Sequence, residues 1–227
     1  MARAALVTGG SSGIGLAIAT MLRAEGFELT LAARTKAKVE AAATELGAHA
    51  VTADVAREED CRRMVDEHRG RHGRLDVLVN SAGVGVAGPI DELETKKIDL
   101  QLDVNLRATM LVTRESLPAL RAARGTIVTL ASIAGTIPVP GLAVYGATKA
   151  ALIAFTDSLN REEEGHGVRA TAISPGFVAT RMTEWTGLPD DEQIQPEDIA
   201  TLVRAVLALS PVARVPNIVV ERLGDTV

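Results

Sequence analysis

A strand, a glycine-rich turn and a helix follow one another at the start of the chain, and this order restricts the fold more than any other stretch. Residues 3–8 form an apolar run typical of a buried strand, and an amphipathic pattern predicts a helix that ends at Gly26. Between them stand Gly9, Gly13 and Gly15. Glycine lets the backbone approach a ligand closely, and a helix N-terminus offers free N–H groups to an anion. The turn therefore favours phosphate binding over the alternative, an ordinary tight turn.

The composition agrees with strands that are buried between helices. Of the 227 residues, 47% are hydrophobic but only 2% are aromatic, so alanine, valine, leucine and isoleucine build the core. Runs rich in valine and isoleucine alternate with alanine-rich helical segments, which is typical of an α/β fold with parallel strands covered by helices. A chain of this length is long enough for one substantial core and short for two. We therefore expect a single domain over residues 1–227.

Charge and cysteine content argue against several classes of protein. The net charge of −5 is unlike that of a nucleic-acid binder, which usually carries a basic face. Cys61 is the only cysteine, so no intrachain disulfide is expected. His68 and His72 lie close to it on or just past the expected helix 57–69, but no second set of ligands accompanies them, so no metal site is expected. Without a signal peptide or a long apolar span, we expect no membrane partner and a cytoplasmic location.

Basic residues follow the second expected strand, residues 27–34. Arg34, Lys36 and Lys38 lie at the start of the next helix, and no acidic residue comes before Glu40. The helix dipole disfavours cations there, so an anion is expected to neutralise them. An NAD site would place an acidic residue near this strand end for the ribose hydroxyls, whereas a 2′-phosphate fits basic residues. The sequence thus predicts NADP(H) in preference to NAD(H), with a solvated basic turn as the alternative.

Two further expected strands end in residues that a ligand can reach. The third, residues 49–55, ends at Asp54 and Val55. The Asp54 carboxylate either accepts a hydrogen bond from an adenine amino group or caps the helix that follows. The fourth strand, residues 75–83, ends in segment 80–83, where small side chains leave room for a ligand against the backbone.

A serine, a tyrosine and a lysine are spaced for acid–base chemistry in the middle of the chain. Ser132 follows an apolar, strand-like run, and Tyr145 and Lys149 are four residues apart, which places them on one face of a helix. A phenol carries protons poorly near neutral pH, but a neighbouring cation stabilises the phenolate and lowers its pKa. The Ser132 hydroxyl would orient the group that receives the proton. Because such pairs also occur on ordinary helix surfaces, the rest of the chain has to decide between the two interpretations.

A buried amide is expected in the long helix predicted over residues 95–123. Asn105 lies between apolar neighbours, and a buried amide within a helix needs a hydrogen-bond partner. Asn105 is either a satisfied core amide or a link to the lysine side of the site.

Taken together, these residues resemble the classical short-chain dehydrogenases/reductases. The likeness runs from about residue 3 to residue 223 in the family's order and spacing, and the ordered set is specific although each motif alone is weak. The matching positions are Thr8, Gly9, Gly13, Gly15, Asp54, Asn80, Ser81, Ala82, Gly83, Asn105, Ser132, Tyr145, Lys149, Pro175, Gly176 and Thr180. Ser81 departs from the family, which more often has a second asparagine there.

The resemblance implies a Rossmann-type, doubly wound parallel sheet of about seven strands with helices on both faces. It implies that Tyr145 is the general acid/base, that Lys149 binds the nicotinamide ribose and lowers the Tyr145 pKa, and that Ser132 polarises the substrate carbonyl. Asn105 would hold a water in a proton relay, and an arginine at the position of Arg34 usually marks NADP preference. The cofactor contacts predicted from the turn, the strand ends and the resemblance are Gly9, Ser11, Ser12, Gly13, Ile14, Gly15, Arg34, Asp54, Val55, Asn80, Ala82, Gly83, Tyr145, Lys149, Pro175, Gly176, Val178 and Thr180.

The substrate side is less defined. Residues 177–195 are expected to form a short substrate loop, in which Met182 and Trp185 either close over an apolar substrate or pack at the surface or a subunit contact. The resemblance implies a secondary alcohol and ketone pair, of the type in which 3-oxo acids are reduced or small 3-hydroxy acids and β-hydroxy amino acids are oxidised.

Two expectations concern assembly and the alternative to catalysis. Small residues on the Tyr145 helix permit a second copy to pack closely, so a homodimer or homotetramer is expected. The alternative function is a non-catalytic NADP(H)-binding sensor or scaffold, which the presence of Asn105, Ser132, Tyr145 and Lys149 disfavours.

Overall fold

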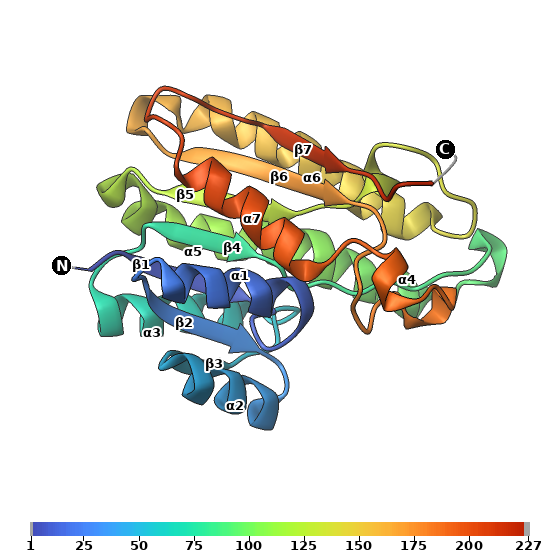
Figure 1. The fold of residues 1–227 in the computed structure, drawn as a ribbon, viewed down its shortest axis with the longest axis horizontal. Coiled ribbons are helices and arrows are strands. Elements are labelled where there is room, and N and C mark those ends of the chain that lie inside the picture. Colours follow the sequence, from blue (N-terminus) through green and yellow to red (C-terminus); the bar gives the residue numbers. More distant parts are fainter. Residues whose placement is uncertain (1, 225–227) are drawn as a thin grey trace.

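The computed structural model describes residues 2–224, which contain one seven-stranded parallel sheet (Figure 1). The strands are β1 (Ala4–Thr8), β2 (Glu28–Ala33), β3 (His49–Thr52), β4 (Val77–Asn80), β5 (Thr126–Leu130), β6 (Arg169–Pro175) and β7 (Asn217–Val220). Their spatial order is β3-β2-β1-β4-β5-β6-β7, so the direction of winding reverses between β1 and β4. The expected doubly wound sheet is confirmed.

Helices cover both faces of this sheet (Figure 1). The longer ones are α1 (Gly13–Ala24), α2 (Lys36–Leu46), α3 (Glu58–His72), α4 (Thr95–Gln101), α5 (Ala108–Ala123), α6 (Ala143–Glu162) and α7 (Pro196–Leu207). Successive strand residues point to opposite faces, so Val7 packs with α1, α2 and α7 while Leu6 packs with α3 and α5. Two apolar cores result, one on each side, as a sheet buried on both faces requires.

The expectation of an uninterrupted α-helix over residues 95–123 is wrong in the middle. Between α4 and α5 the chain forms a π-helix over Leu102–Arg107. There the Asn105 side chain exchanges two hydrogen bonds with the Val84 backbone, accepting from its N–H at 2.8 Å and donating to its carbonyl at 2.9 Å. The wider turn accompanies a tertiary contact to a distant loop, and helical periodicity in the sequence does not report such contacts.

Two features are absent from the described residues. No helix within residues 2–224 combines the length and the apolar character needed to cross a bilayer. In the same part of the chain, no group of three or more His, Cys, Asp or Glu side chains is arranged to hold a metal ion.

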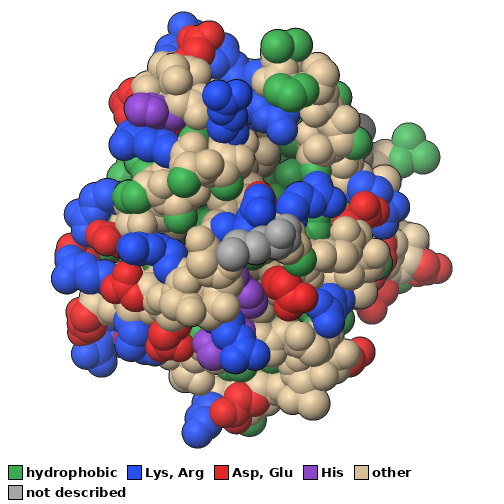
Figure 2. All heavy atoms as spheres, turned by 90° about the vertical axis from the view of Figure 1, so that its left-hand side faces the viewer, with side chains coloured by type: hydrophobic (Ala, Val, Ile, Leu, Met, Phe, Trp, Pro, Cys, Tyr) green, Lys and Arg blue, Asp and Glu red, His purple; other side chains and the backbone are tan. Residues whose placement is uncertain are grey.

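The edge where the strands begin carries charged side chains of both signs, with histidines among them (Figure 2). Inside this edge, His68 of α3 is fully buried. Its Nε2 lies 3.0 Å from the Arg74 carbonyl oxygen, which only accepts, so Nε2 carries the ring proton and Nδ1 accepts from the Thr30 hydroxyl at 2.9 Å. The Thr30 oxygen also lies 3.1 Å from Nε2 of His72. This chain of hydrogen bonds fastens α3 to β2.

Acid is expected to weaken this fastening. Burial lowers the pKa of His68 from 6.5 to about 4, so between these values the unfolded chain binds one more proton than the folded chain. Stability therefore falls as the pH drops through that window, by about 3 kcal/mol from this residue at its limit. Urea unfolding at stepped pH measures the slope.

His68→Leu should lose the part of the slope that His68 contributes, while the exposed His166→Gln should keep it. An unchanged slope in His68→Leu would contradict the prediction.

Candidate active site

Parallel strands all end at one edge of the sheet, so the segments that follow them meet there (Figure 1, right). The predicted site residues nearly all belong to these segments. The glycine turn follows β1, Arg34 follows β2, and segment 80–83 ends β4. Ser132 comes directly after β5, and the run from Gly176 to Thr180 comes after β6.

The glycine turn is packed without space for side chains. Gly9 has φ +67°, and a Cβ there would lie 2.9 Å from the Ala82 backbone nitrogen. A Cβ on Gly15 would lie 2.5 Å from the Gly9 carbonyl oxygen. A Cβ on Gly13, which has φ +52°, would lie 3.0 Å from Cγ2 of Thr180. The turn therefore contacts both the end of β4 and the segment after β6, which joins two predicted groups of residues far apart in the sequence.

The start of α1 is open to a ligand. The helix begins at Gly13, and its N-cap residue Ser12 has extended backbone and makes no capping hydrogen bond with its side chain. The first N–H groups of a helix have no partner within the helix, and the dipole makes this end positive. The arrangement fits a phosphate group, because the glycine turn keeps side chains away from those N–H groups.

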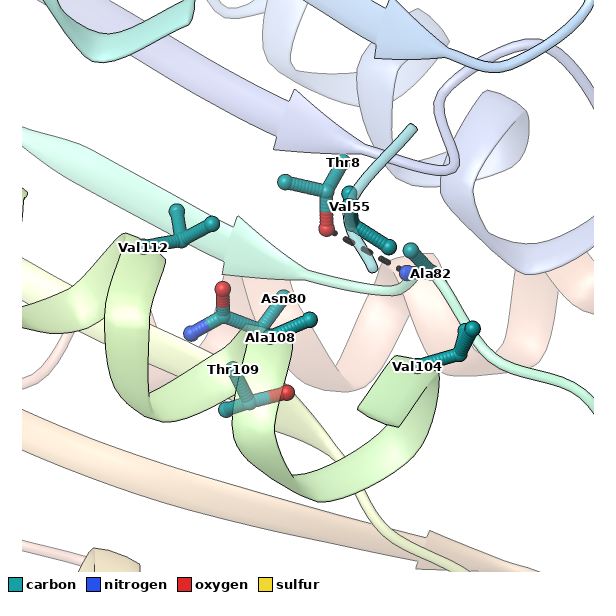
Figure 3. A pocket seen from close by; sticks show the side chains of 8 residues that line it. All are labelled: Thr8, Val55, Asn80, Ala82, Val104, Ala108, Thr109 and Val112. Atoms are coloured by element: carbon teal, nitrogen blue, oxygen red, sulfur yellow. Dashed lines mark hydrogen bonds between the residues drawn. The ribbon is translucent and has the colours of Figure 1, made fainter. Parts of the chain in front are cut away.

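Thr8 is a site residue whose role the sequence did not reveal. Its hydroxyl oxygen accepts from the backbone N–H groups of Ser81 at 3.1 Å and Ala82 at 3.2 Å, which fixes the end of β4 against β1. Beside it lies a small hollow (Figure 3). The residues that line it are Thr8, Val55, Asn80, Ala82, Val104, Ala108, Thr109 and Val112. Three predicted cofactor residues from two strand ends thus surround one hollow.

Asn80 is held by a partner that could not be read from its surroundings in the sequence. Its Nδ2 donates to the Thr113 hydroxyl of α5 at 3.1 Å, across 33 positions of chain. Its buried Oδ1 has no hydrogen-bond partner among the described residues. That unpaired acceptor belongs to a residue that lines this narrow hollow.

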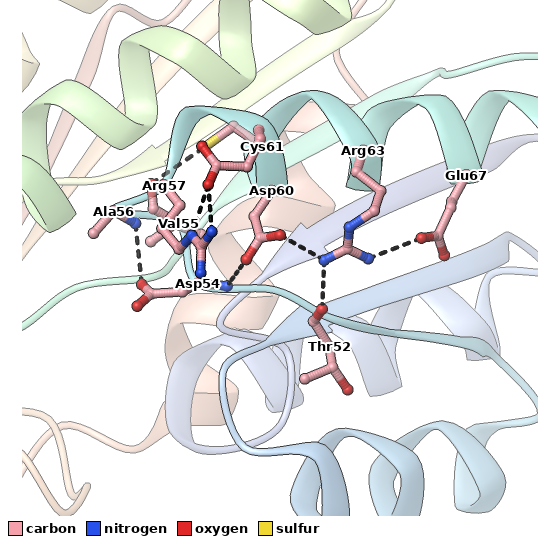
Figure 4. Close-up of polar contacts among 10 residues, drawn as sticks. Thr52, Asp54, Val55, Ala56, Arg57, Asp60, Cys61, Arg63 and Glu67 are labelled. Carbon is pink, nitrogen blue, oxygen red and sulfur yellow. Dashed lines mark hydrogen bonds and ion pairs between the residues drawn. The ribbon is translucent and has the colours of Figure 1, made fainter.

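Asp54 does not cap α3, so the capping interpretation is wrong. The helix begins at Glu58 with Arg57 as its N-cap residue. The Asp54 carboxylate instead accepts from the Ala56 N–H at 3.1 Å, and the Asp54 N–H donates to Asp60 at 2.9 Å (Figure 4). The Asp54 and Asp60 carboxylates therefore both stabilise the turn after β3. Asp60 is itself held in place by Arg63, at 2.7 Å. The adenine contact stays a prediction.

The basic residues after β2 face solvent. Arg34 is exposed, and no hydrogen bond or ion pair joins it to another residue in the described part of the chain. Lys36 lies 3.8 Å from Glu40, an exposed pair that contributes little. The Arg34 guanidinium is therefore available to an anion at the open edge.

Ser132, Tyr145 and Lys149 come together as the spacing predicts. Lys149 of α6 is buried and its Nζ donates to the Leu130 carbonyl at the end of β5 at 2.7 Å. Nζ lies 5.6 Å from the centroid of the Tyr145 ring. The Ser132 hydroxyl hydrogen-bonds the Tyr145 phenol and accepts from the Ala134 N–H at 3.2 Å. A phenol, a hydroxyl and an amine thus share one partly enclosed site.

The expected lowering of the Tyr145 pKa by Lys149 is not what the structure gives. Burial raises the pKa of Tyr145, and the hydrogen bond from Ser132 offsets only part of this rise. Burial also lowers the pKa of Lys149 to about 8, because the enclosed site penalises an isolated ammonium. Burial thus penalises the phenolate and the ammonium when either stands alone, and a phenolate would form most readily together with the lysine cation.

Asn105 proves to be a satisfied amide that also borders the lysine. A Cβ on Gly83 would lie 3.4 Å from Oδ1 of Asn105 and 3.6 Å from Nζ of Lys149. An added Cβ would make ordinary van der Waals contact with both polar groups, so Gly83 borders the Asn105 amide and the Lys149 amine. The structure brings Asn105 and Lys149 to one place, while the water relay stays a prediction.

The loop over residues 177–195 reaches the tyrosine through Met182. A Cβ on Gly85 would lie 3.8 Å from the Tyr145 ring and 3.9 Å from Cγ of Met182, so this glycine separates the two. Trp185 is 65% exposed and packs edge-on against Phe177, with ring centroids 6.3 Å apart. Met182 thus borders the site, and Trp185 borders the surface. The positions of Gly85 beside Tyr145 and of Phe177 beside Trp185 could not be predicted from the sequence.

Comparisons with known proteins agree with this geometry. The profile of the family described as short chain dehydrogenase matches residues 3–189. An uncharacterized oxidoreductase of Staphylococcus epidermidis is 38% identical over 204 residues, which cover 88% of this chain and 89% of that protein. An uncharacterized oxidoreductase of Staphylococcus aureus is 36% identical over 203 residues, which cover 88% of each.

Solved structures resemble the whole chain. An alcohol dehydrogenase from the archaeon Thermococcus sibiricus, complexed with 5-hydroxy-NADP, matches with a TM-score of 0.92 and 28% identity, over 100% of this chain and 99% of that one. A mutant short-chain dehydrogenase/reductase of Serratia marcescens matches with a TM-score of 0.87 and 26% identity, over 97% of this chain and 96% of that one.

The packed turn predicts an unequal response to two glycine substitutions. Gly15→Ala should destabilise the protein by about 1–3 kcal/mol and weaken dinucleotide binding, because the new Cβ would meet the Gly9 carbonyl at 2.5 Å. Gly70→Ala in α3 is the control, since a Cβ there meets nothing within 4 Å and alanine favours a helix by up to about 1 kcal/mol. Urea unfolding and a dinucleotide titration measure both variants. Wild-type stability in Gly15→Ala would refute the packed turn.

Proposed function

Because the chain belongs to the short chain dehydrogenase family, we propose that it interconverts a secondary alcohol and a ketone with NADP(H) as its cofactor. Membership makes it an NAD(P)-dependent oxidoreductase. The observation that carries the finer proposal is the group of Ser132, Tyr145 and Lys149, in which a buried amine and a hydroxyl flank one phenol. The segment after β5 supplies the serine, and α6 supplies the tyrosine and the lysine.

The open edge of the sheet fits a dinucleotide. The uncapped start of α1 and the glycine turn would hold the diphosphate. The free N–H groups would donate to its oxygens, and the glycines leave the backbone open to it. The hollow beside Thr8, with the unpaired Oδ1 of Asn80 among its lining residues, would border the adenosine half. Lys149 would bind the nicotinamide ribose. Bound there, the nicotinamide supplies the hydride chemistry that side chains lack.

Proton transfer is the part assigned to the protein. In the reducing direction the Tyr145 hydroxyl gives its proton to the carbonyl oxygen, and in the oxidising direction it takes a proton from the alcohol. Ser132, which lies beside the phenol, would turn its single hydroxyl hydrogen to the same substrate oxygen and fix its place. Lys149 stabilises the phenolate as a close, net-neutral pair, since burial disfavours either charge alone.

The preference for NADP(H) is supported by the charge after β2. Arg34 is exposed and unpaired among the described residues, and no acidic side chain follows β2 before Glu40 to accept ribose hydroxyls. A guanidinium recognises a 2′-phosphate well because it offers a fork of N–H donors. The alcohol dehydrogenase that this chain resembles is complexed with an NADP derivative, which agrees with the proposal.

The proposed substrate is a small carbonyl compound of the 3-oxo acid type, or the alcohol derived from it. Assembly as a homodimer or homotetramer is supported by an exposed small-residue face on α6, with Ala143, Ala147, Ala150 and Ala154, and by exposed Met110 on α5. The cytoplasmic location stays a prediction. A screen of NADPH consumption over small ketones, 3-oxo esters, quinones and steroids tests the function and narrows the substrate. Tight NADPH binding without any turnover would favour the sensor or scaffold alternative.

Tyr145→Phe should abolish turnover while leaving cofactor binding intact. The variant removes only the phenolic hydroxyl, and the loss of a general acid/base typically lowers kcat by about 10²–10⁴-fold. Steady-state kinetics and an NADPH titration measure the two effects. Substantial remaining activity would contradict the assignment of Tyr145 as the general acid/base.

Arg34→Ala should raise the Kd for NADPH about tenfold and leave the Kd for NADH unchanged, because only the former carries the 2′-phosphate. Arg161→Ala, which removes an exposed arginine near the end of α6, is the control and should alter neither value. If wild type and Arg34→Ala bind the two cofactors alike, the NADP preference is wrong.

A further inference from the structure

We infer that Thr148 is a positioning residue, whose hydroxyl holds the first turn of α6 against Asn105 and so places Tyr145 and Lys149 for proton transfer. The inference rests on the proposed function for its catalytic meaning. Thr148 lies between the two residues of the pair and is only 1% exposed, so its side chain points into the protein rather than into the substrate site.

A continuous chain of hydrogen bonds passes through Thr148. Its hydroxyl donates to the Tyr145 carbonyl at 2.7 Å and accepts from Nδ2 of Asn105 at 3.2 Å. The other N–H of that amide donates to the Val84 carbonyl at 2.9 Å, while Oδ1 accepts from the Val84 N–H at 2.8 Å. The side chains of Asn105 and Thr148 thus join the loop after β4, the π-helix and α6.

The direction of every bond in this chain is fixed. The Val84 N–H needs an acceptor, so the amide oxygen of Asn105 must face it and both amide hydrogens are left for Val84 and Thr148. The Tyr145 carbonyl only accepts, so the Thr148 hydroxyl must donate to it. Asn105 is itself only 1% exposed, so water cannot reach its amide. Removing the Thr148 oxygen therefore leaves a buried N–H without a hydrogen-bond partner.

This chain of hydrogen bonds ends beside Tyr145 and Lys149. Gly83 lies between Oδ1 of Asn105 and Nζ of Lys149, with an added Cβ 3.4 Å and 3.6 Å from them. A displacement of Asn105 or of the first turn of α6 would therefore change two distances. These are the distance from the loop after β4 to the lysine and the distance from that loop to the phenol. Proton transfer depends steeply on such distances, and a misplacement of about 1 Å can lower a rate about 10²-fold.

Thr156 offers a matched comparison in the same helix. It is also 1% exposed, and its hydroxyl donates to the Leu152 carbonyl at 2.8 Å, one turn back along α6. No hydrogen bond joins it to another element among the described residues. Replacing either threonine by valine removes one bond to a helix carbonyl, but only Thr148→Val breaks a link between elements.

The first experiment compares Thr148→Val, Thr148→Ser and Thr156→Val in the whole protein. Thr148→Val should lower kcat at least about tenfold and change the Kd for NADPH less than about threefold, since no hydrogen bond among the described residues joins Thr148 to the glycine turn. Thr148→Ser keeps the hydroxyl and should stay within about threefold of the wild-type kcat. Thr156→Val should keep the wild-type kcat even if it lowers the unfolding midpoint.

A second measurement does not depend on turnover. Tyr145 is the only tyrosine of the chain, so tyrosinate absorbance reports this residue alone. Burial raises its pKa in the wild type, so little tyrosinate should form at about pH 10. In Thr148→Val a loosened first turn admits water, the pKa falls toward its ordinary value, and more tyrosinate should form at the same pH. Thr148→Ser and Thr156→Val should match the wild type, with circular dichroism confirming that each variant is folded.

The outcomes separate the inference from the function. A wild-type kcat and wild-type tyrosinate titration in Thr148→Val overturn the inference, and so do equal losses in Thr148→Val and Thr156→Val or in Thr148→Val and Thr148→Ser. If the wild type turns over no carbonyl compound, the proposed function fails, while the titration still decides whether Thr148 positions Tyr145.

Discussion

Parallel pairing of the seven strands sets the position of the candidate active site. Because all strands run the same way, every strand ends at one edge, and the winding reverses between β1 and β4. The glycine turn, Arg34, segment 80–83 and Ser132 are thereby brought together although they are spread over more than half of the chain. A sheet with antiparallel strands would divide these segments between two edges.

The edge is then made rigid by polar contacts between distant segments. The Thr8 hydroxyl binds the end of β4, and Asp60 fixes the turn after β3. The Asn105 amide binds the Val84 backbone and reaches Thr148 in α6. Each contact replaces water for a buried polar group, so the groups around Tyr145 are held before any substrate arrives. Burial also penalises an isolated tyrosinate and an isolated ammonium, so a phenolate forms most readily as a pair with the lysine cation.

Much of the fold and site could be predicted because local spacing determines it. A four-residue interval places Tyr145 and Lys149 on one helix face whatever surrounds them, and a strand, a glycine turn and a helix specify one local geometry. The mistakes concern contacts between distant residues. The π-helix was missed because its wide turn accompanies a bond from Asn105 to Val84, and the capping interpretation of Asp54 failed because Arg57 precedes the first turn of α3.

The class of fold, the glycine turn and the trio of Ser132, Tyr145 and Lys149 can be predicted without the structure, since they follow from residue type and short-range spacing. The direction of the Tyr145 pKa, the partners of Asn80 and Asn105, and the link through Thr148 depend on how the whole chain packs. The physical reason is that desolvation and hydrogen bonding depend on which residues enclose a group. Those neighbours come from other strands and helices, so they are chosen by the packing of the whole chain.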